Sequence, residues 1–188
     1  MKIKNVKSGI KLLFRDVYWN IYRKFGSIDI KFSHNKRIIF VCKGNVCRSP
    51  FAEYYARKSL KEYASNIEIL SAGYSVTEAN PTPDEGLQVA KQYGVNLEAH
   101  RSRQLTNGML HESSVVVFEA KHIKAIEQMF PEIKDRIYLL PCLQNNVVNC
   151  SSYDLFNISD PYGKNTDAFV DCYKRISWCI DILFTKLN

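Results

Sequence analysis

The chain has 188 residues, of which 46% are hydrophobic and 24% are charged, and its net charge is +7. A chain of this length can bury one sizeable core, so we expect one globular domain with an appendage rather than several domains. No apolar run approaches the roughly 20 residues that a membrane-spanning helix needs, so we expect no such helix.

The positive charge is concentrated at the N-terminus. Ten of the 26 Lys and Arg lie within residues 1–37 together with only two acidic residues, so this segment has a net charge of +8 and the rest of the chain −1. The excess of positive charge therefore lies in one segment, and it does not predict nucleic-acid binding by the whole fold.

Six cysteines are present, but no leader with a short apolar core and a cleavage site precedes them. We therefore expect a cytoplasmic protein whose thiols are mostly reduced. The spacing of the four cysteines after the first pair suits no tetrahedral metal site, so we expect them to be structural and the protein to need no metal or other cofactor. The six are Cys42, Cys47, Cys142, Cys150, Cys172 and Cys179.

Apolar residues recur at three- and four-residue steps from Ile3 to Phe25, and Gly26 follows as a C-cap. This pattern predicts an amphipathic helix over residues 2–25 whose other face is basic. We therefore divide the chain into an N-terminal extension, residues 1–36, and a domain of residues 37–188. The helix has three alternative roles: packing on the domain, binding an acidic or helical partner, or lying on an anionic membrane surface, which would place the protein at the inner face of the membrane.

Strand-like and helical segments alternate through the rest of the chain. The short apolar runs at 37–42, 67–71, 115–118 and 136–140 are typical of buried strands. Helical patterns begin at Ser49, with Ser as cap and Pro50 at the first helical position, and cover 84–93, 121–130 and 166–187. This alternation predicts an α/β fold with a parallel sheet and helices on both of its faces.

The segment that begins with Cys42 and ends with Pro50 lies between a predicted strand and a predicted helix. Cys42 and Arg48 are separated by five residues, enough for a loop whose backbone N–H groups surround a tetrahedral dianion at a helix N-terminus. Gly44 permits a close approach and a positive φ, and Asn45 tolerates the left-handed region. The guanidinium of Arg48 matches two oxygens of a phosphate.

The same surroundings favour ionisation of Cys42. A helix N-terminus, a guanidinium and the Ser49 hydroxyl would make it a thiolate at neutral pH, and therefore a nucleophile that is sensitive to oxidation. Cys47 has two alternative roles, as a buried spectator or as the partner that forms a reversible disulfide with oxidised Cys42.

The run Cys42-Lys-Gly-Asn-Val-Cys-Arg-Ser-Pro50 resembles the phosphate loop of the low-molecular-weight protein tyrosine phosphatases, and the resemblance extends from residue 37 to the C-terminus. Residues 71–73, 100–105 and 118–122 are similar to further segments of bacterial members, and Asp160-Pro161-Tyr162 is similar to the loop that carries their general acid. The resemblance implies a four-stranded parallel sheet of order 2-1-3-4.

It also implies the chemistry. Cys42 would attack phosphorus, Arg48 and the loop amides would stabilise the transferred group, and Asp160 would act first as acid and then as base on a phosphocysteine intermediate. The residues implied to bind the substrate are Lys43, Gly44, Asn45, Val46, Cys47, Ser49 and Tyr162, and those implied to brace the loop are Ser71 and His100. For Asp160, a role as a turn residue before Pro161 is the alternative.

Lys43 stands where the family usually has an apolar residue, so a positive rim would favour acidic sequences around the phosphotyrosine. Gly163 replaces a second aromatic residue of some members, which would open the slot for the ring. The substrates implied by similarity to bacterial members are a tyrosine kinase that phosphorylates itself, or proteins of exopolysaccharide and capsule export.

Three other functions compete with this interpretation. Arsenate reductases use a similar loop but need two further cysteines, which residues 117–122 lack. Protein-arginine phosphatases of the same family carry Thr where Val46 stands. A non-catalytic phosphate-binding module would have no need of Cys42, Arg48 and Asp160 together.

Overall fold

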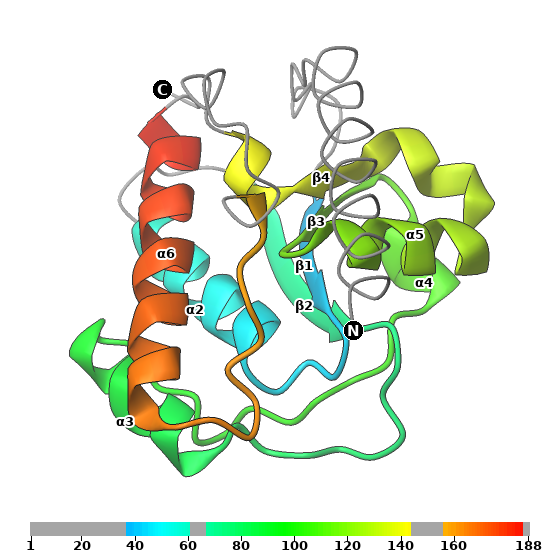
Figure 1. The fold of residues 1–188 in the computed structure, drawn as a ribbon. Coiled ribbons are helices and arrows are strands. Elements are labelled where there is room, and N and C mark those ends of the chain that lie inside the picture. The colour runs from blue at the N-terminus through cyan, green and yellow to red at the C-terminus, as the bar shows by residue number, and fades with distance from the viewer. Residues whose placement is uncertain (1–36, 61–66, 144–155, 186–188) are drawn as a thin grey trace, which may run out of the picture.

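The computed structural model describes residues 37–60, 67–143 and 156–185 (Figure 1). The predicted helix of residues 2–25, the N-terminal extension and Cys150 lie outside the described residues. Within the described part of the chain, no helix is both long and apolar enough to cross a bilayer.

A four-stranded parallel sheet forms the centre of the molecule. Its strands are β1 (Arg37–Cys42), β2 (Glu68–Gly73), β3 (Ser113–Val117) and β4 (Ile137–Leu139), in the order β2-β1-β3-β4. The predicted sheet and its order are confirmed. Cys42 pairs with Gly73 on β2, and the preceding residue Val41 pairs with Val117 on β3. The carboxyl ends of three strands therefore meet at one edge, which is where parallel α/β sheets bind ligands.

Helices cover both faces of the sheet, as predicted (Figure 1). On one side lie α2 (Arg48–Leu60), α3 (Asp84–Gln92) and α6 (Thr166–Thr185), and on the other α4 (Asn107–Leu110) and α5 (Ala120–Met129). Side chains of β1 alternate between the two layers: Ile38 and Phe40 belong to the apolar cluster under α2 and α6, whereas Ile39 and Val41 belong to the cluster under α5. Two 3-10 helices, η2 (Pro131–Arg136) and η3 (Leu140–Leu143), flank β4.

Most element boundaries differ from the predicted ones by one or two residues, and two of the differences concern the site. β2 continues to Gly73 because residues 71–73 pair with the end of β1. The helix α2 begins at Arg48, so Ser49 lies inside its first turn rather than capping it. The helix α4 and the two 3-10 helices were not predicted, since four to six residues are too few to show a helical period.

Candidate active site

The loop of residues 43–47 connects β1 to α2 and is held from outside. The backbone N–H groups of Tyr74 and Ser75 donate to the carbonyl oxygens of Cys42 and Lys43 at 3.1 and 3.0 Å, and the Tyr173 hydroxyl donates to the carbonyl of Cys47 at 3.3 Å. The Asn45 N–H points the other way, 3.2 Å from Cys42 Sγ. The loop therefore curves around the sulfur, with a backbone donor directed at it.

Asn45 has the left-handed backbone conformation that this curvature requires, with φ of 53°. The sequence allowed Gly44 or Asn45 to take this role, and the structure assigns it to Asn45, because Gly44 is not among the described residues with positive φ. The Asn45 side chain is buried and fully bonded. Its Nδ2 donates to Ser49 Oγ at 2.8 Å and to Ser71 Oγ at 2.9 Å, while its Oδ1 accepts the Arg103 N–H at 3.0 Å.

The Ser49 hydroxyl joins this network to the thiol. Its oxygen lies 3.1 Å from Cys42 Sγ and 3.3 Å from the carbonyl oxygen of Ala72. Because Ser49 Oγ accepts a hydrogen bond from Asn45, its own proton is free for one of these two acceptors. When Cys42 is ionised, Ser49 can donate to the thiolate.

A buried carboxylate lies behind the network and was missed by the sequence analysis. Glu53 on α2 accepts a hydrogen bond from the Ser71 hydroxyl and forms ion pairs with Arg57 at 2.7 Å and Arg103 at 3.4 Å. Arg103 also donates to the Ser71 carbonyl at 2.7 Å. Glu53 had no sequence signal beyond its helix position and charge, and Arg103 was covered only by the resemblance of residues 100–105 to bacterial members, since only the fold brings these two side chains together.

His100 contacts the backbone of the 43–47 loop. Its Nε2 lies 2.8 Å from the carbonyl oxygen of Asn45, and since a carbonyl can only accept, Nε2 carries the proton. Burial lowers the pKa of His100, against the opposing effect of this hydrogen bond. A neutral, buried imidazole that donates to the backbone is suited to bracing the loop.

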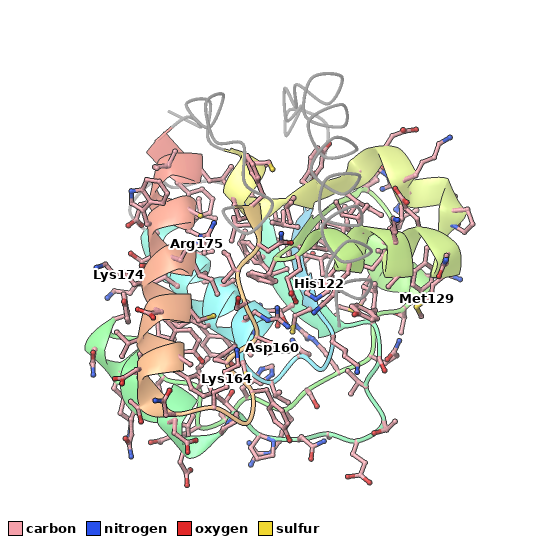
Figure 2. All side chains as sticks on the ribbon, viewed as in Figure 1. His122, Met129, Asp160, Lys164, Lys174 and Arg175 are labelled. Carbon is pink, nitrogen blue, oxygen red and sulfur yellow. The ribbon has the colours of Figure 1, made fainter. Side chains whose placement is uncertain are left out.

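Arg48 is almost completely buried, with 1% of its surface exposed, and its two terminal nitrogens contact two carboxylates. Nη1 lies 2.6 Å from Glu119 and donates to the carbonyl of Ile158 at 3.1 Å, while Nη2 lies 2.6 Å from Asp160. Figure 2 shows Asp160 on the segment that leads into α6. Burial opposes the charge of Arg48, but Cys42, Asp160 and Glu119 together outweigh it and raise its pKa, so Arg48 is a fixed cation beside the thiol.

Glu119 is the second carboxylate that the sequence analysis did not single out, although it lies within the segment that resembles bacterial members. It contacts Arg48, Lys121 at 2.9 Å and the Nε2 of His122 at 3.1 Å. Burial opposes its ionisation, but the close contacts with His122, Arg48 and Lys121 hold its pKa far below the usual range. His122, labelled in Figure 2, is fully buried, and burial lowers its pKa as well.

A cavity of about 540 Å³ opens beside the thiol. It brings together seven of the predicted site residues: Cys42, Lys43, Gly44, Val46, Cys47, Asp160 and Tyr162. Asn45, Arg48, Ser49, Ser71 and His100 are buried and support this wall from behind. Tyr162 is 65% exposed at the cavity mouth, where an aromatic ring can contact a ligand.

Gly73 is a further residue that the structure, and not the sequence, connects with the loop. A Cβ at this position would lie 2.7 Å from the carbonyl oxygen of Lys43 and 3.0 Å from the backbone nitrogen of Asn45. Only glycine therefore lets the end of β2 approach the loop so closely.

The cysteines differ strongly in their surroundings. Cys42 and Cys47 are both free thiols in this structure, so no disulfide joins them. Burial raises the pKa of Cys47 and of Cys172, and both therefore stay protonated at neutral pH. Within the described ranges no group of three or more His, Cys, Asp or Glu side chains is arranged to hold a metal ion.

The arrangement suits transfer of a phosphoryl group. A sulfur lies within a backbone loop at the N-terminus of α2, a buried guanidinium lies beside it, and a partly exposed carboxylate shares the cavity. The loop and the helix N-terminus favour an anion, the sulfur is a nucleophile, and the carboxylate can move a proton.

Comparisons with known proteins agree with this geometry. Residues 37–188 match the family model described as low molecular weight phosphotyrosine protein phosphatase. The chain is 29% identical over 153 residues to the probable low molecular weight protein-tyrosine-phosphatase EpsP of Ralstonia solanacearum, covering 81% of this chain and 97% of that protein.

The similar solved structures include a tyrosine phosphatase and an arginine phosphatase. The tyrosine phosphatase AmsI of Erwinia amylovora has 28% identity and a TM-score of 0.69, and the match covers 81% of this chain and 93% of that one. The YwlE arginine phosphatase of Geobacillus stearothermophilus has 28% identity and a TM-score of 0.69, with 80% and 92% covered. The shared fold therefore extends over nearly the whole of each relative.

Proposed function

This chain belongs to the low-molecular-weight phosphotyrosine protein phosphatase family and is a protein-tyrosine phosphatase, and from that premise we propose that Cys42, Arg48 and Asp160 carry out its reaction. The family acts through a cysteine intermediate. Cys42, Arg48 and Asp160 are the residues whose surroundings suit the nucleophile, the phosphate clamp and the proton donor.

In the first step the Cys42 thiolate attacks phosphorus, and a phosphorus–sulfur bond forms as the bond to the tyrosine oxygen breaks. Asp160 gives its proton to the leaving phenolate. The contact of 3.2 Å from the Asn45 amide and that of 3.1 Å from Ser49 support a thiolate at this position. The presence of Asp160 and Cys42 on one cavity wall supports the role of proton donor.

Arg48 holds the phosphoryl oxygens during this transfer. Its guanidinium is kept in place by Glu119 and by the Ile158 carbonyl, both on Nη1, so Nη2 is the end that is shared with Asp160. A phosphate in the loop competes with Asp160 for this nitrogen. Binding of the substrate would then release the carboxyl group for proton transfer to the leaving oxygen.

In the second step water attacks phosphorus. Asp160, now ionised, takes a proton from the water, the phosphorus–sulfur bond breaks, and Cys42 leaves as a thiolate with inorganic phosphate as the product. The loop amides and Arg48 supply the stabilisation of the transferred charge.

The single observation that carries this assignment is the shared cavity of Cys42, Asp160 and Tyr162. We expect the full chain to release phosphate from a phosphotyrosine peptide under reducing conditions without added metal. Cys42→Ser should abolish turnover, and Asp160→Ala should lower kcat by about 100-fold to 10,000-fold. Full activity in the Cys42→Ser variant would rule out the phosphocysteine intermediate.

Phosphoarginine is the second candidate substrate, because the similar structures include an arginine phosphatase. Val46 lines the cavity at the position where arginine phosphatases of the family carry Thr, which favours tyrosine. The test is a comparison of kcat/KM for phosphotyrosine and phosphoarginine in the same peptide, and a higher value for phosphoarginine would reverse the assignment.

The biological substrates that we propose are tyrosine-phosphorylated proteins of exopolysaccharide or capsule export, including a kinase that phosphorylates itself. The basic N-terminal extension, residues 1–36, would bring the enzyme to the inner membrane face or to a partner. Sedimentation with anionic liposomes, comparing the full chain with one that begins at Asn35, tests the membrane role. Equal partitioning of the two chains would rule it out.

A further inference from the structure

The cavity extends well beyond the thiol. Its volume of about 540 Å³ falls in the range of about 300–1,000 Å³ that holds whole drug-sized ligands, so it has room for more than a phosphorylated ring. The wall away from the loop consists of the segment that leads from β2 to α3. Its lining residues are Ser75, Val76, Thr77, Glu78, Asn80, Pro81, Thr82, Pro83 and Asp84.

This wall is held in one conformation by hydrogen bonds to residues 102–104. Gln104 accepts the Val76 N–H at 2.8 Å through its side chain. Ser102 exchanges hydrogen bonds with Asn80: the Asn80 N–H donates to Ser102 Oγ and the Ser102 N–H to the Asn80 carbonyl, both at 2.9 Å. Ser102 Oγ also donates to the Glu78 carbonyl at 2.8 Å. The backbone of the wall is therefore positioned before any substrate binds.

The wall is negatively charged. Glu78 and Asp84 are both exposed, and neither has an ion-pair partner in the part of the chain that the structure describes. With Asp160, the cavity has three carboxylates against the single positive charge of Lys43. The phosphate of the substrate is neutralised by the loop and Arg48, which leaves Glu78 and Asp84 to act on the rest of the substrate.

Thr82 lies between the two carboxylates in sequence and lines the same wall. It is 2% exposed, and its hydroxyl has no hydrogen-bond partner among the described residues. Buried hydroxyls are normally paired, so this group is an unused hydrogen-bonding position in the wall.

We infer that Glu78 and Asp84 form a subsite for a lysine or arginine side chain close to the phosphotyrosine, and that the enzyme prefers substrates with a basic residue there. This inference rests on the proposed function. It reverses the expectation from Lys43 alone, because two unpaired carboxylates on a positioned wall outweigh one exposed lysine on the rim. Attraction between exposed charges is modest and is screened by salt.

The test measures kcat/KM of the full chain on sets of three phosphotyrosine peptides. Within a set the peptides differ only in one flanking residue, which is Lys, Ala or Glu. One set is made for each of the three positions on either side of the phosphotyrosine. We expect the Lys peptide to exceed the Ala peptide by about threefold to tenfold at one or more positions at low salt. The preference should shrink as salt is raised to 0.5 M.

Variants assign the preference to residues. In Glu78→Gln/Asp84→Asn the ratio of the Lys to the Ala peptide should fall to about one, and in Glu78→Lys the Glu peptide should become favoured. The matched control is Glu132→Gln, an exposed carboxylate on η2 outside the cavity, which should keep the ratio of the wild type. Circular dichroism verifies that each variant is folded.

Three results would each overturn a specific claim. Equal turnover of the three peptides, or a preference for Glu, overturns the inference while leaving the proposed function intact. A preference for Lys that persists in the double variant overturns the assignment to Glu78 and Asp84. If the wild type hydrolyses none of the peptides, including the Ala peptide, the proposed function itself fails.

Discussion

Glu119 and Asp160 both contact Arg48 at 2.6 Å. We nevertheless expect removal of the Glu119 charge to lower mainly the stability of the fold, and removal of the Asp160 charge to lower mainly the activity. The perturbation is Glu119→Gln compared with Asp160→Asn, each of which removes one negative charge and keeps the side-chain shape. The side chain of Glu119 is 13% exposed and that of Asp160 is 41% exposed. The first pair is therefore mostly buried, whereas the second is partly in water.

The expected loss of stability follows from this burial. Breaking a buried ion pair costs about 3–5 kcal/mol, and we expect about 2–3 kcal/mol for Glu119→Gln because Gln still accepts a hydrogen bond and Arg48 keeps Asp160. An exposed pair contributes at most about 1 kcal/mol, which is the limit for Asp160→Asn. For a domain of this size the Glu119 variant should melt about 5–10 °C below the wild type.

Activity should show the reverse order. Asp160→Asn removes the proton donor, so kcat should fall by about 100-fold or more. Glu119→Gln leaves the proton donor in place and only loosens Arg48, so its kcat/KM should fall by about 10-fold to 100-fold, with weaker inhibition by phosphate.

The assay is thermal unfolding by circular dichroism together with kinetics on a phosphotyrosine peptide. A Glu119 variant that melts within 1 °C of the wild type, or an Asp160 variant that loses more stability than the Glu119 variant, would contradict the buried pair as the main anchor of Arg48.

Three further outcomes follow from single positions. Asn45→Ala should be less stable to urea than Asn45→Gly by about 1 kcal/mol, since both lose the side-chain network but only Ala is strained at a φ of 53°; equal midpoints would argue against strain. Gly73→Ala should lose about 1–3 kcal/mol and bind phosphate more weakly, because its Cβ would press on the 43–47 loop, whereas Gly108→Ala, with no atom within 4 Å, should change neither. The pKa of His122 is lowered from 6.5 by burial, so the unfolded chain takes up its proton at a higher pH than the folded one. The contribution of His122 to stability is therefore complete above about pH 6.5 and lost as the pH falls below it, and His122→Gln should flatten the decline in urea midpoint between pH 7.5 and 5.5; an unchanged slope would mean that another group titrates.

The elements that the sequence determined are those with a local signal. The run from Arg37 to Cys42 is a buried strand because it is apolar and rich in β-branched residues, and α6 is long enough to show its period. The loop after β1 was predicted in detail because its residues are contiguous: one strand end, one turn and one helix start contain Cys42, Asn45 and Arg48.

Other features are set only by tertiary contact. The left-handed residue is Asn45 rather than Gly44 because the Asn side chain is bonded to Ser49 and Ser71, from two different elements. Gly73 is needed only because β2 pairs beside β1 and approaches the loop. Such requirements depend on neighbours that are distant in sequence, so no local pattern reveals them.

The sequence by itself therefore determined the class of fold, and it predicted the nucleophile and the residues implied to act with it, because a phosphate loop is one continuous segment. Only the tertiary structure decided what holds Arg48 and what lines the far wall of the cavity. Glu119 lies 71 residues from Arg48 along the chain, and Glu78 and Asp84 come from a connecting segment without a motif. Electrostatic interaction depends on distance through space, and that distance is fixed by the order of the strands.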